Sequence, residues 1–433
     1  MTRPLINIIS LGCSKNLVDS ERLFKLCQDY GVDAVHNGSV DTECDAVVIN
    51  TCGFIADAKE ESINTILEAV DAKKDGLVKA VYVMGCLSQR YPKEMAEEIP
   101  EVDRWYGKTS WVDLLKDIGF KPRCSSRNFE RQLTTPSYSA YLKIAEGCDR
   151  YCAFCAIPII TGHYKSRPIE EIVDEVKWLV SKGVKEINVI AQEITRYGVD
   201  LYGKVEIARL IDSIASISGV EWIRLHYAYP ADFPTELLDV MAKHSNICRY
   251  LDIALQHISD KVLANMRRRI TGDETRALLS SIRDKVPGIH IRTTLMVGFP
   301  GEGEAEFNEL LDFVKEQRFE RMGAFAYCEE DDTYAARTFK DLIPQDVKQS
   351  RLDELMELQE SISQEINYNK IGQKIRVLVE SEDDQYYIGR SEYDSPEVDP
   401  EILIEKNRVL PIGQFCTVEI TDALPFDLIG RPC

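Results

Sequence analysis

Short apolar runs alternate with amphipathic stretches over most of this 433-residue chain, and this alternation restricts the fold more than any other feature. In residues 1–121, three such runs are each followed by a stretch with the helical spacing of apolar residues, and they lie at 6–9, 46–49 and 80–83. Strands that alternate with helices through short connections form a parallel sheet covered by helices. We therefore predict an N-terminal parallel α/β sheet domain over residues 1–121.

A second alternating region covers residues 138–367. It contains six candidate strands separated by helical patterns, at 141–145, 186–191, 222–226, 250–255, 289–297 and 321–327. A complete eight-unit βα barrel usually needs ~250 residues, so six units favour a partial, TIM-like (βα)6 barrel. An amphipathic helix is predicted over residues 346–369, and we expect it to act as a spacer.

Two segments lack this alternation. Residues 122–137 are polar and aperiodic, contain Pro122 and Pro136, and are interpreted as a linker. Residues 368–433 contain short β runs separated by turns rich in Asp, Pro and Gly, which is typical of a small all-β barrel. The fold class predicted for the whole chain is α/β, with an all-β domain at the C-terminal end.

Three of the 13 cysteines lie close together just after the first barrel strand, at Cys148, Cys152 and Cys155. Active sites of βα barrels lie at the carboxyl ends of the strands, and this spacing can surround one face of a metal centre. Three thiolates are one ligand short of a closed zinc site or a fully ligated 4Fe-4S cluster, which leaves one position open. The alternative is a zinc site that takes a fourth Cys or His from elsewhere.

Three further cysteines, Cys13, Cys52 and Cys86, follow the three predicted strands of the N-terminal domain. Because the carboxyl ends of parallel strands lie at one edge of a sheet, we expect these thiols to converge in one crevice. A glycine beside each cysteine would let the backbone approach a bulky cofactor. The alternative is three buried cysteines that act as small hydrophobic residues. The other seven have no comparable spacing and are interpreted as structural or incidental: Cys27, Cys44, Cys124, Cys248, Cys328, Cys416 and Cys433.

Charge and hydropathy exclude several classes of protein. The net charge of -20 argues against a nucleic-acid binder, which needs clustered Lys and Arg. No apolar run approaches the ~20 residues that span a bilayer, and the N-terminal segment lacks the apolar region of a signal peptide. We therefore expect a cytoplasmic protein with no membrane partner, whose thiols stay reduced.

These features are together similar to those of the methylthiotransferases of the radical S-adenosylmethionine (SAM) superfamily. The triad Cys148, Cys152 and Cys155, with Phe154 before the last cysteine, resembles the superfamily signature. The family consists of an N-terminal cluster domain, a radical SAM core and a C-terminal TRAM domain, so the resemblance covers essentially the whole chain.

Two subfamilies compete. RimO-type enzymes modify an aspartate of ribosomal protein S-twelve, whereas the alternative subfamily modifies C2 of a tRNA adenosine. Four segments resemble the RimO type: SLGCSKNLVDSE at 10–21, INTCGFI at 49–55, YGVDLYG at 197–203 and DSPEVD at 394–399. The tRNA enzymes typically carry Gln and Met between the first cysteine and the following Asn.

The charge of the last domain is an independent criterion. Residues 371–433 contain 6 Lys and Arg against 13 Asp and Glu, a net charge of -7. A module that binds tRNA phosphates should be basic, whereas an acidic module suits a basic ribosomal protein. An ordinary solvated acidic surface is the alternative explanation.

The resemblance implies two 4Fe-4S clusters and SAM as cofactors. One cluster would be held by Cys148, Cys152 and Cys155 and bind SAM, whose cleavage gives a 5′-deoxyadenosyl radical that removes a hydrogen from the β-carbon of the aspartate. The second would be held by Cys13, Cys52 and Cys86 and present sulfur, and a second SAM would supply the methyl group. The implied partners are ribosomal protein S-twelve, free or in the small subunit, and an electron donor such as flavodoxin or ferredoxin; tRNA is not expected.

The resemblance also indicates residues that contact SAM, and these follow barrel strands: Phe154, Gln192, Glu193, Gly298, Gly301 and Glu302. The alternative for residues 298–302 is an ordinary strand-to-helix turn. Glu193 and Gly303 depart from the usual Asp and Thr of the family. No catalytic acid or base is assigned. Two readings outside the family stay open at this point, an iron–sulfur electron carrier and a zinc-binding module.

Overall fold

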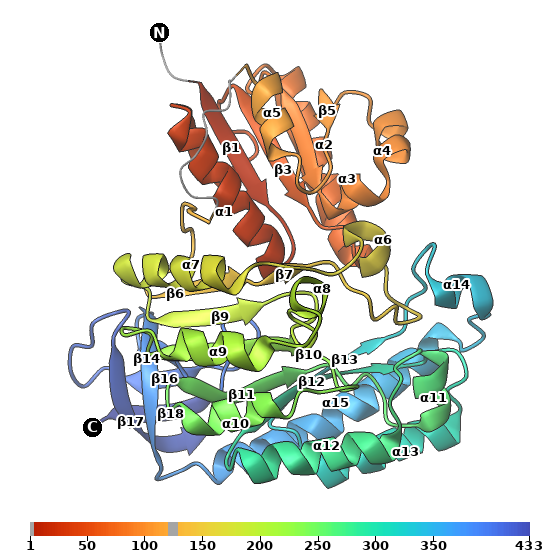
Figure 1. The fold of residues 1–433 in the computed structure, drawn as a ribbon, viewed down its shortest axis with the longest axis vertical. Helices are drawn as coiled ribbons and strands as arrows, with labels where there is room; N and C mark the ends of the chain where they lie inside the picture. The colour runs from red at the N-terminus through yellow and green to blue at the C-terminus, as the bar shows by residue number, and fades with distance from the viewer. Residues whose placement is uncertain (1–3, 120–128) are drawn as a thin grey trace.

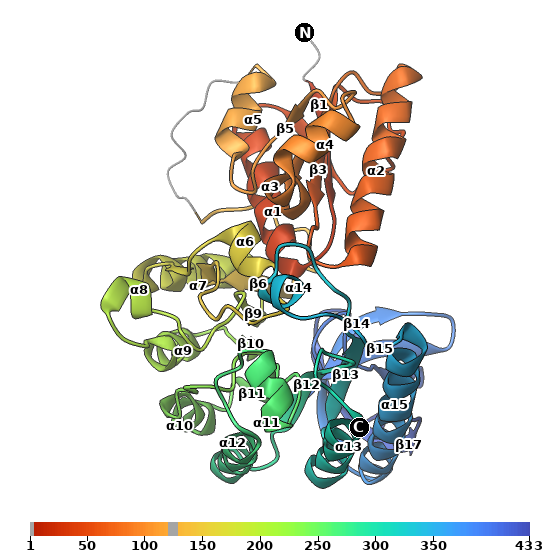
Figure 2. The ribbon, with the colours of Figure 1, turned by 90° about the vertical axis from the view of Figure 1, so that its right-hand side faces the viewer.

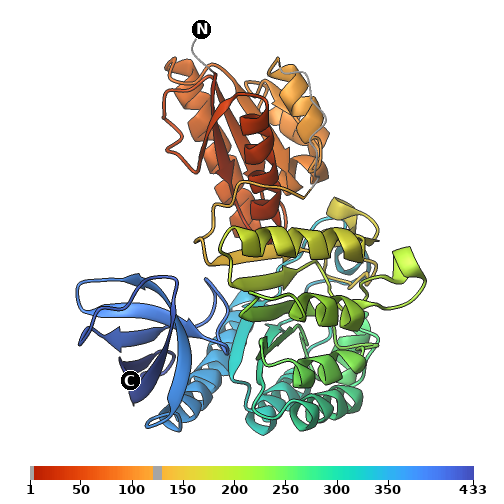
Figure 3. The ribbon, with the colours of Figure 1, turned by 60° about the vertical axis from the view of Figure 1, so that its left-hand side comes forward.

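The computed structural model describes residues 4–119 and 129–433, and its elements form three units (Figure 1). An N-terminal α/β unit lies above a six-stranded parallel sheet, and a small β-barrel lies beside that sheet (Figure 3). The α/β class with a C-terminal all-β barrel is therefore confirmed. Residues 120–128, which hold Cys124 and the first part of the predicted linker, lie outside the described residues, as do residues 1–3.

The N-terminal unit is a five-stranded parallel sheet of order β2-β1-β3-β4-β5. Every residue of the central strand β3 is buried, because helices cover both faces of the sheet. Its strands are β1 (Leu5–Ser10), β2 (Asp33–His36), β3 (Ala46–Thr51), β4 (Val81–Gly85) and β5 (Arg104–Trp105). Its helices are α1 (Ser14–Asp29), α2 (Ala56–Lys74), α3 (Cys86–Arg90), α4 (Pro92–Glu98) and α5 (Trp111–Asp117).

The middle unit is a six-stranded sheet of order β6-β9-β10-β11-β12-β13, and all its neighbouring strands are parallel. The sheet is open, because β6 and β13 do not pair with each other. Its strands are β6 (Ser139–Lys143), β9 (Glu186–Ile190), β10 (Trp222–Ala228), β11 (Ile247–Ile253), β12 (His290–Val297) and β13 (Arg321–Ala326). A short antiparallel ribbon, β7 (Ala145–Glu146) with β8 (Lys165–Ser166), follows the first strand.

Helices form an arc around the outside of this sheet (Figure 2). They bury one apolar stripe, as in α9, where Ile207, Leu210, Ile211 and Ile214 are fully buried at helical spacing. The longer helices are α7 (Ile169–Ser181), α9 (Ile207–Ala215), α10 (Glu236–Lys243), α12 (Gly272–Lys285) and α13 (Glu304–Gln317). The shorter ones are α6 (Ile157–Thr161), α8 (Val199–Tyr202), α11 (Asp260–Asn265) and α14 (Tyr334–Thr338).

The long helix expected to act as a spacer has a different role. This helix, α15 (Gln345–Tyr368), packs against the edge strand β13 and against α13. Leu355 and Ile362 are buried there in the same core as the sheet. The apolar stripe needs a partner, and the open edge of the sheet provides one, so α15 is part of the middle unit.

The C-terminal unit is a closed barrel of order β14-β15-β16-β18-β17. Its pairs are antiparallel except for β16 with β18, and closure leaves no free strand edge. The strands are β14 (Lys374–Glu382), β15 (Tyr386–Ser391), β16 (Ile402–Glu405), β17 (Phe415–Ala423) and β18 (Leu428–Pro432). The barrel packs on the middle sheet through Phe415, whose ring lies edge-on to Trp222 with centroids 4.7 Å apart.

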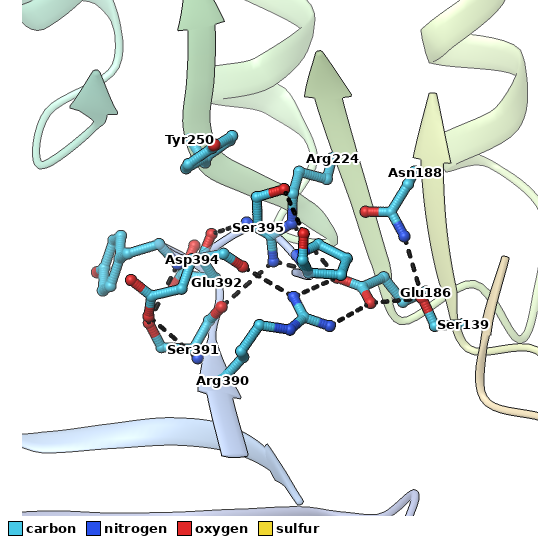
Figure 4. Close-up of polar contacts among 12 residues, drawn as sticks. Ser139, Glu186, Asn188, Arg224, Tyr250, Arg390, Ser391, Glu392, Asp394 and Ser395 are labelled. Carbon is cyan, nitrogen blue, oxygen red and sulfur yellow. Dashed lines mark hydrogen bonds and ion pairs between the residues drawn. The ribbon is translucent and has the colours of Figure 1, made fainter. Parts of the chain in front are cut away.

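Buried ion pairs join the two units at the amino ends of the middle strands (Figure 4). Glu186 is fully buried, and its carboxylate accepts from Arg390 Nη2 at 2.7 Å and from Arg224 Nη2 at 3.2 Å. Asp394, in the loop after β15, accepts from Arg321 Nη2 at 2.6 Å. The C-terminal unit therefore closes the amino end of the sheet and leaves the carboxyl end to the N-terminal unit.

Candidate functional site

Cys148, Cys152 and Cys155 lie in the loop that leaves the β7 strand at the carboxyl edge of the middle sheet. Gly147 has φ +80°, and a Cβ there would lie 2.1 Å from the carbonyl oxygen of His163, so a glycine is required for this turn. Burial raises the pKa of Cys148 to about 12 and also raises that of Cys155, and neighbouring thiols of the triad add to both shifts. The structure thus brings these three thiols together.

Two buried arginines lie beside the barrel triad. The Nη1 atom of Arg268 donates to Cys152 Sγ at 3.3 Å, and the hydroxyl of Tyr229 lies 3.7 Å from the same sulfur. The guanidinium groups of Arg268 and Arg150 each lie 4.1 Å from the ring centroid of Tyr229. The guanidinium groups supply positive charge beside thiols that bind metal only as thiolates. Sequence reasoning missed the role of these residues, because their contacts join three separate loops.

Cys13, Cys52 and Cys86 converge at the carboxyl edge of the N-terminal sheet. Burial raises the pKa of Cys52 and raises that of Cys86 to about 12; Cys13 adds to both shifts, and Cys52 adds to that of Cys86. A Cβ on Gly12 would lie 2.6 Å from Cys52 Cβ, and one on Gly53 would lie 2.8 Å from the carbonyl carbon of Cys86. These glycines therefore let the cysteine-bearing segments approach one another.

The N-terminal triad lies against the segment that follows the barrel triad, at the junction of the N-terminal and middle units. Cys86 packs with Ala156 and Ile160, directly after Cys155. Below this contact, Glu146 accepts from Lys108 Nζ at 2.6 Å. Burial opposes ionisation of Glu146, yet the ammonium groups of Lys143 and Lys108 lower its pKa. This charged group fixes the relative position of the triads.

The donor sets fit iron–sulfur clusters better than zinc. Within residues 4–119 and 129–433, no three His, Cys, Asp or Glu side chains meet closely enough to hold a single metal ion. Each cysteine of a cubane binds a different iron, so cluster ligands do not need to converge on one point. Two groups of three thiols match clusters that keep one iron open.

In the turn at residues 298–302, contacts within the chain explain why glycine and glutamate occupy their positions. A Cβ on Gly298 would lie 2.4 Å from Lys348 Cγ, and one on Gly301 would lie 2.4 Å from Asn265 Nδ2. The buried carboxylate of Glu302 accepts from Gly298 N at 2.9 Å and from Arg351 Nη1 at 2.8 Å. Both glycines and Glu302 therefore shape the turn through contacts with the chain itself.

The other predicted SAM contacts lie nearer the barrel triad. Gln192 donates to Glu146, while its Oε1 is buried without a hydrogen-bond partner among the described residues. Glu193 accepts from Arg150 Nε at 3.1 Å, so its carboxylate is already hydrogen-bonded within the chain. Phe154 lies edge-on to Phe299 with centroids 6.2 Å apart. Of this set, Gln192 has free capacity for a ligand.

Models of three protein families match the chain. They are described as the radical SAM superfamily at residues 142–314, the uncharacterized protein family UPF0004 at residues 5–107, and the TRAM domain at residues 371–433. These matches fall on the middle, N-terminal and C-terminal units, respectively. Within the described part of the chain, no helix has the length and apolar character to cross a membrane.

Proteins named ribosomal protein uS12 methylthiotransferase RimO are similar to the chain over its full length. The one from Bacteroides fragilis is 58% identical over 432 residues, covering 100% of both chains. The one from Bacteroides thetaiotaomicron is 57% identical and covers 100% of this chain and 99% of its own. The one from Cytophaga hutchinsonii is 49% identical over 98% and 97%, respectively.

Solved structures with the same fold are much more distant in sequence. The radical SAM methyltransferase TsrM from Kitasatospora setae, with cobalamin and a 4Fe-4S cluster bound, is 15% identical with a TM-score of 0.59, covering 77% of each chain. The cobalamin-dependent SAM radical enzyme OxsB is 15% identical with a TM-score of 0.52, covering 83% of this chain and 56% of its own. These two structures support the fold alone.

Proposed function

We propose the function of this chain from one premise: the chain belongs to the RimO family of methylthiotransferases, within the radical SAM superfamily. It is accordingly a radical SAM methylthiotransferase that uses an iron–sulfur cluster and SAM. Its substrate, on our proposal, is the β-carbon of an aspartate in ribosomal protein uS12, which receives a methylthio group. The proposal further assigns two 4Fe-4S clusters to the chain.

The packing of one cysteine of the N-terminal triad on the segment that follows the barrel triad carries this proposal. Cys148, Cys152 and Cys155 would hold one cluster, and Cys13, Cys52 and Cys86 the other. When bound, the first cluster and SAM supply the radical that breaks an unactivated C–H bond, and the second cluster supplies the sulfur. The packing of Cys86 on Ala156 and Ile160 supports a reaction that uses both sites on one substrate carbon.

The residues around the triads position these groups and exclude water. Arg268 places positive charge beside Cys152 and Arg150 places it near Cys148, and the pairing of Glu146 with Lys108 and Lys143 holds the two units together. Gln192, through its free Oε1, and Phe154 are proposed to contact SAM directly. Gly298, Gly301, Glu302 and Glu193 are proposed to shape the SAM site through their contacts within the chain.

The remaining assignments follow from the same premise. We assign residues 1–121 to the cluster domain, 122–137 to the linker, 138–367 to the radical SAM core and 368–433 to the TRAM domain. The acidic TRAM domain is suited to basic uS12, free or in the small subunit, and a flavodoxin or ferredoxin is the proposed electron donor. The cytoplasm is the proposed location.

A second candidate is methylthiolation of a tRNA adenosine, because the family model for the N-terminal unit and the two triads do not separate the two substrates. The net charge of -7 over residues 371–433 favours the protein substrate.

A paired incubation tests the function. The chain is reconstituted with iron and sulfide without oxygen, supplied with SAM and reductant, and incubated with uS12 and with tRNA. Mass spectrometry should find one methylthio group on an aspartate of uS12 and none on tRNA. A methylthio mass increase on tRNA alone would overturn the proposal.

A cysteine variant tests the second cluster. Cys13→Ala should lower the iron and sulfide content by about half and prevent formation of the methylthio product. Cys433→Ala, which removes an exposed cysteine outside both triads, is the matched control. It should retain the wild-type iron and sulfide content and form the methylthio product. Full product formation by Cys13→Ala would contradict the two-cluster assignment.

A further inference from the structure

Lys15 is buried at the junction of the two cysteine triads. It is the second residue of α1, two positions after Cys13, and only 8% of the residue is exposed. Its Nζ lies 3.5 Å from the ring centroid of Tyr227, at the carboxyl end of β10 in the middle sheet. The side chain therefore extends from the N-terminal unit to the carboxyl edge of the middle sheet, where Cys148, Cys152 and Cys155 lie.

The ammonium group of Lys15 has no carboxylate partner within salt-bridge distance among the described residues, whereas the neighbouring buried lysines do. Lys108 pairs with Glu146 at 2.6 Å, and Lys143 pairs with Asp19 and with Glu146. A lone buried ammonium is costly, and the face of an aromatic ring offsets that cost only in part. The position is thus prepared for an anion that the chain itself does not supply.

Two local features strengthen this reading. Lys15 lies in the first turn of a 16-residue helix, where the helix dipole disfavours a cation and favours an incoming anion. Tyr227, which carries the ring below the ammonium, has φ +63°, a strained value for a residue other than glycine. Strain of this kind is retained where the surrounding structure holds a functional geometry.

The carboxylate that contacts the backbone of Tyr227 is bound by other groups of the chain. Asp252 accepts from the backbone N–H of Tyr227 at 3.1 Å and pairs with Arg292 at 3.4 Å. It is therefore turned toward the backbone and toward Arg292.

We infer that Lys15 binds the side-chain carboxylate of the target aspartate and thereby selects an acidic side chain as substrate. This inference rests on the proposed function. The carboxylate carbon is bonded directly to the reacting β-carbon, so an ion pair with Lys15 holds that carbon at the junction of the triads. An adenine base carries no negative group and would leave the ammonium without a partner.

Binding of uS12 to the reconstituted holoenzyme tests the inference. The modified aspartate is located by mass spectrometry and replaced by asparagine in a second preparation of uS12. The wild-type enzyme should bind the aspartate form about 10- to 100-fold more tightly than the asparagine form, as expected for one charge-assisted hydrogen bond. K15M should bind the aspartate form more weakly by that same factor, so that its affinities for the two forms are equal.

Two further variants complete the test. K15R retains a positive charge and should recover part of the preference for aspartate. K25M makes the same substitution at the surface of the same helix, where Lys25 pairs with Asp29, and should bind as the wild type does.

The possible failures are distinguishable. If the wild-type enzyme transfers nothing to uS12, the proposed function fails and the inference with it. If the wild-type enzyme is active and K15M still prefers aspartate to asparagine by the wild-type factor, the inference alone is overturned. A lower iron content in K15M than in K25M would also overturn it, because Lys15 would then support a cluster rather than the substrate.

Discussion

The two ends of the middle sheet both contain buried charge, but they use it differently. At the amino ends, Glu186 meets Arg224 and Arg390, and Asp394 meets Arg321, so each carboxylate has a guanidinium partner. Toward the carboxyl ends lie the thiols of Cys148, Cys152 and Cys155, the ammonium of Lys15, which has no carboxylate partner among the described residues, and the free Oε1 of Gln192. The carboxylates named at the amino ends are thus satisfied by the chain, although Lys370 is also buried there without a carboxylate partner among the described residues. The unpaired groups at the carboxyl ends differ in that they lie beside the cysteine triads.

Backbone strain does not separate the two ends. Tyr151, Tyr227, Gln256 and Arg267 have positive φ near the carboxyl ends or in the triad loop, but Arg318 before β13 and Glu397 in the loop after β15 have positive φ as well. In βα barrels, the carboxyl end carries activity and the amino end carries stability. Burial of charge alone therefore does not mark a functional site; a buried charge without a partner is the stronger indication where it lies beside the cysteine triads, as Lys15 does.

The largest effect should come from a cysteine at the carboxyl end. Cys152→Ala removes a proposed cluster ligand and should lower product formation by at least about 10⁴-fold, equal to about 5 kcal/mol of transition-state stabilisation. The unfolding free energy of the cluster-free chain should change by less than about 1 kcal/mol, because Cys152 is only partly buried. Assays of 5′-deoxyadenosine and denaturant unfolding measure the two quantities. If Cys152→Ala lost as much unfolding free energy as transition-state stabilisation, the carboxyl and amino ends of the sheet would not differ in role.

A substitution at the amino end should have the opposite pattern. Glu186→Ala leaves Arg224 and Arg390 buried without their shared carboxylate, which should cost about 3–5 kcal/mol of unfolding free energy. Below the new unfolding temperature, the activity per folded molecule should stay near that of the wild type. Urea unfolding and a single-temperature assay check this prediction. A stable but inactive Glu186→Ala protein would contradict it.

The same carboxylate should make stability depend on acid pH. Burial opposes ionisation of Glu186, but Arg390 and Arg224 lower its pKa from 4.5 to about 2. A lowered pKa in the folded state stabilises the protein above the unfolded pKa, and this contribution of about 3 kcal/mol is lost as the pH falls from 4.5 to 2. Glu186→Gln cannot titrate at this position, so the difference in unfolding free energy between wild type and variant should narrow over that range in the cluster-free chain. If the difference in unfolding free energy between wild type and Glu186→Gln stayed constant from pH 4.5 to 2, the ion pairs of Glu186 would not be its source.

The smallest effect is expected from an exposed ion pair between the same two units. Arg376 of the C-terminal barrel donates to Glu221 at 2.7 Å, and both side chains are nearly half exposed. Glu221→Ala should change the unfolding free energy by about 0–1 kcal/mol, since water and salt screen such pairs. If its effect in urea unfolding equalled that of Glu186→Ala, burial would not explain the stability of the amino end.

Much of the fold could be predicted from hydrophobic periodicity, with errors at the ends of elements. The first barrel strand was predicted at 141–145 and is Ser139–Lys143, and the fourth was predicted at 250–255 and is Ile247–Ile253. Strand ends depend on which backbone groups find partners in the neighbouring strand, which a single strand does not reveal. The helix predicted at 346–369 is present as Gln345–Tyr368, but its predicted role as a spacer was wrong for a related reason, because only the folded sheet offers β13 as a partner for its apolar stripe.

The sequence by itself determined the two groups of cysteines, the βα order and the acidic C-terminal domain, since each depends on residue types and on spacing along the chain. Only the tertiary structure decided that Arg268 reaches Cys152, that Glu302 is held by Arg351, and that Lys15 lies over Tyr227 with no carboxylate beside it among the described residues. These contacts join residues that are tens to hundreds of positions apart, and whether a charge is paired is a property of three-dimensional proximity. The sequence therefore located the candidate ligands, and the fold distinguished the charges that stabilise the chain from the one that we assign to its substrate.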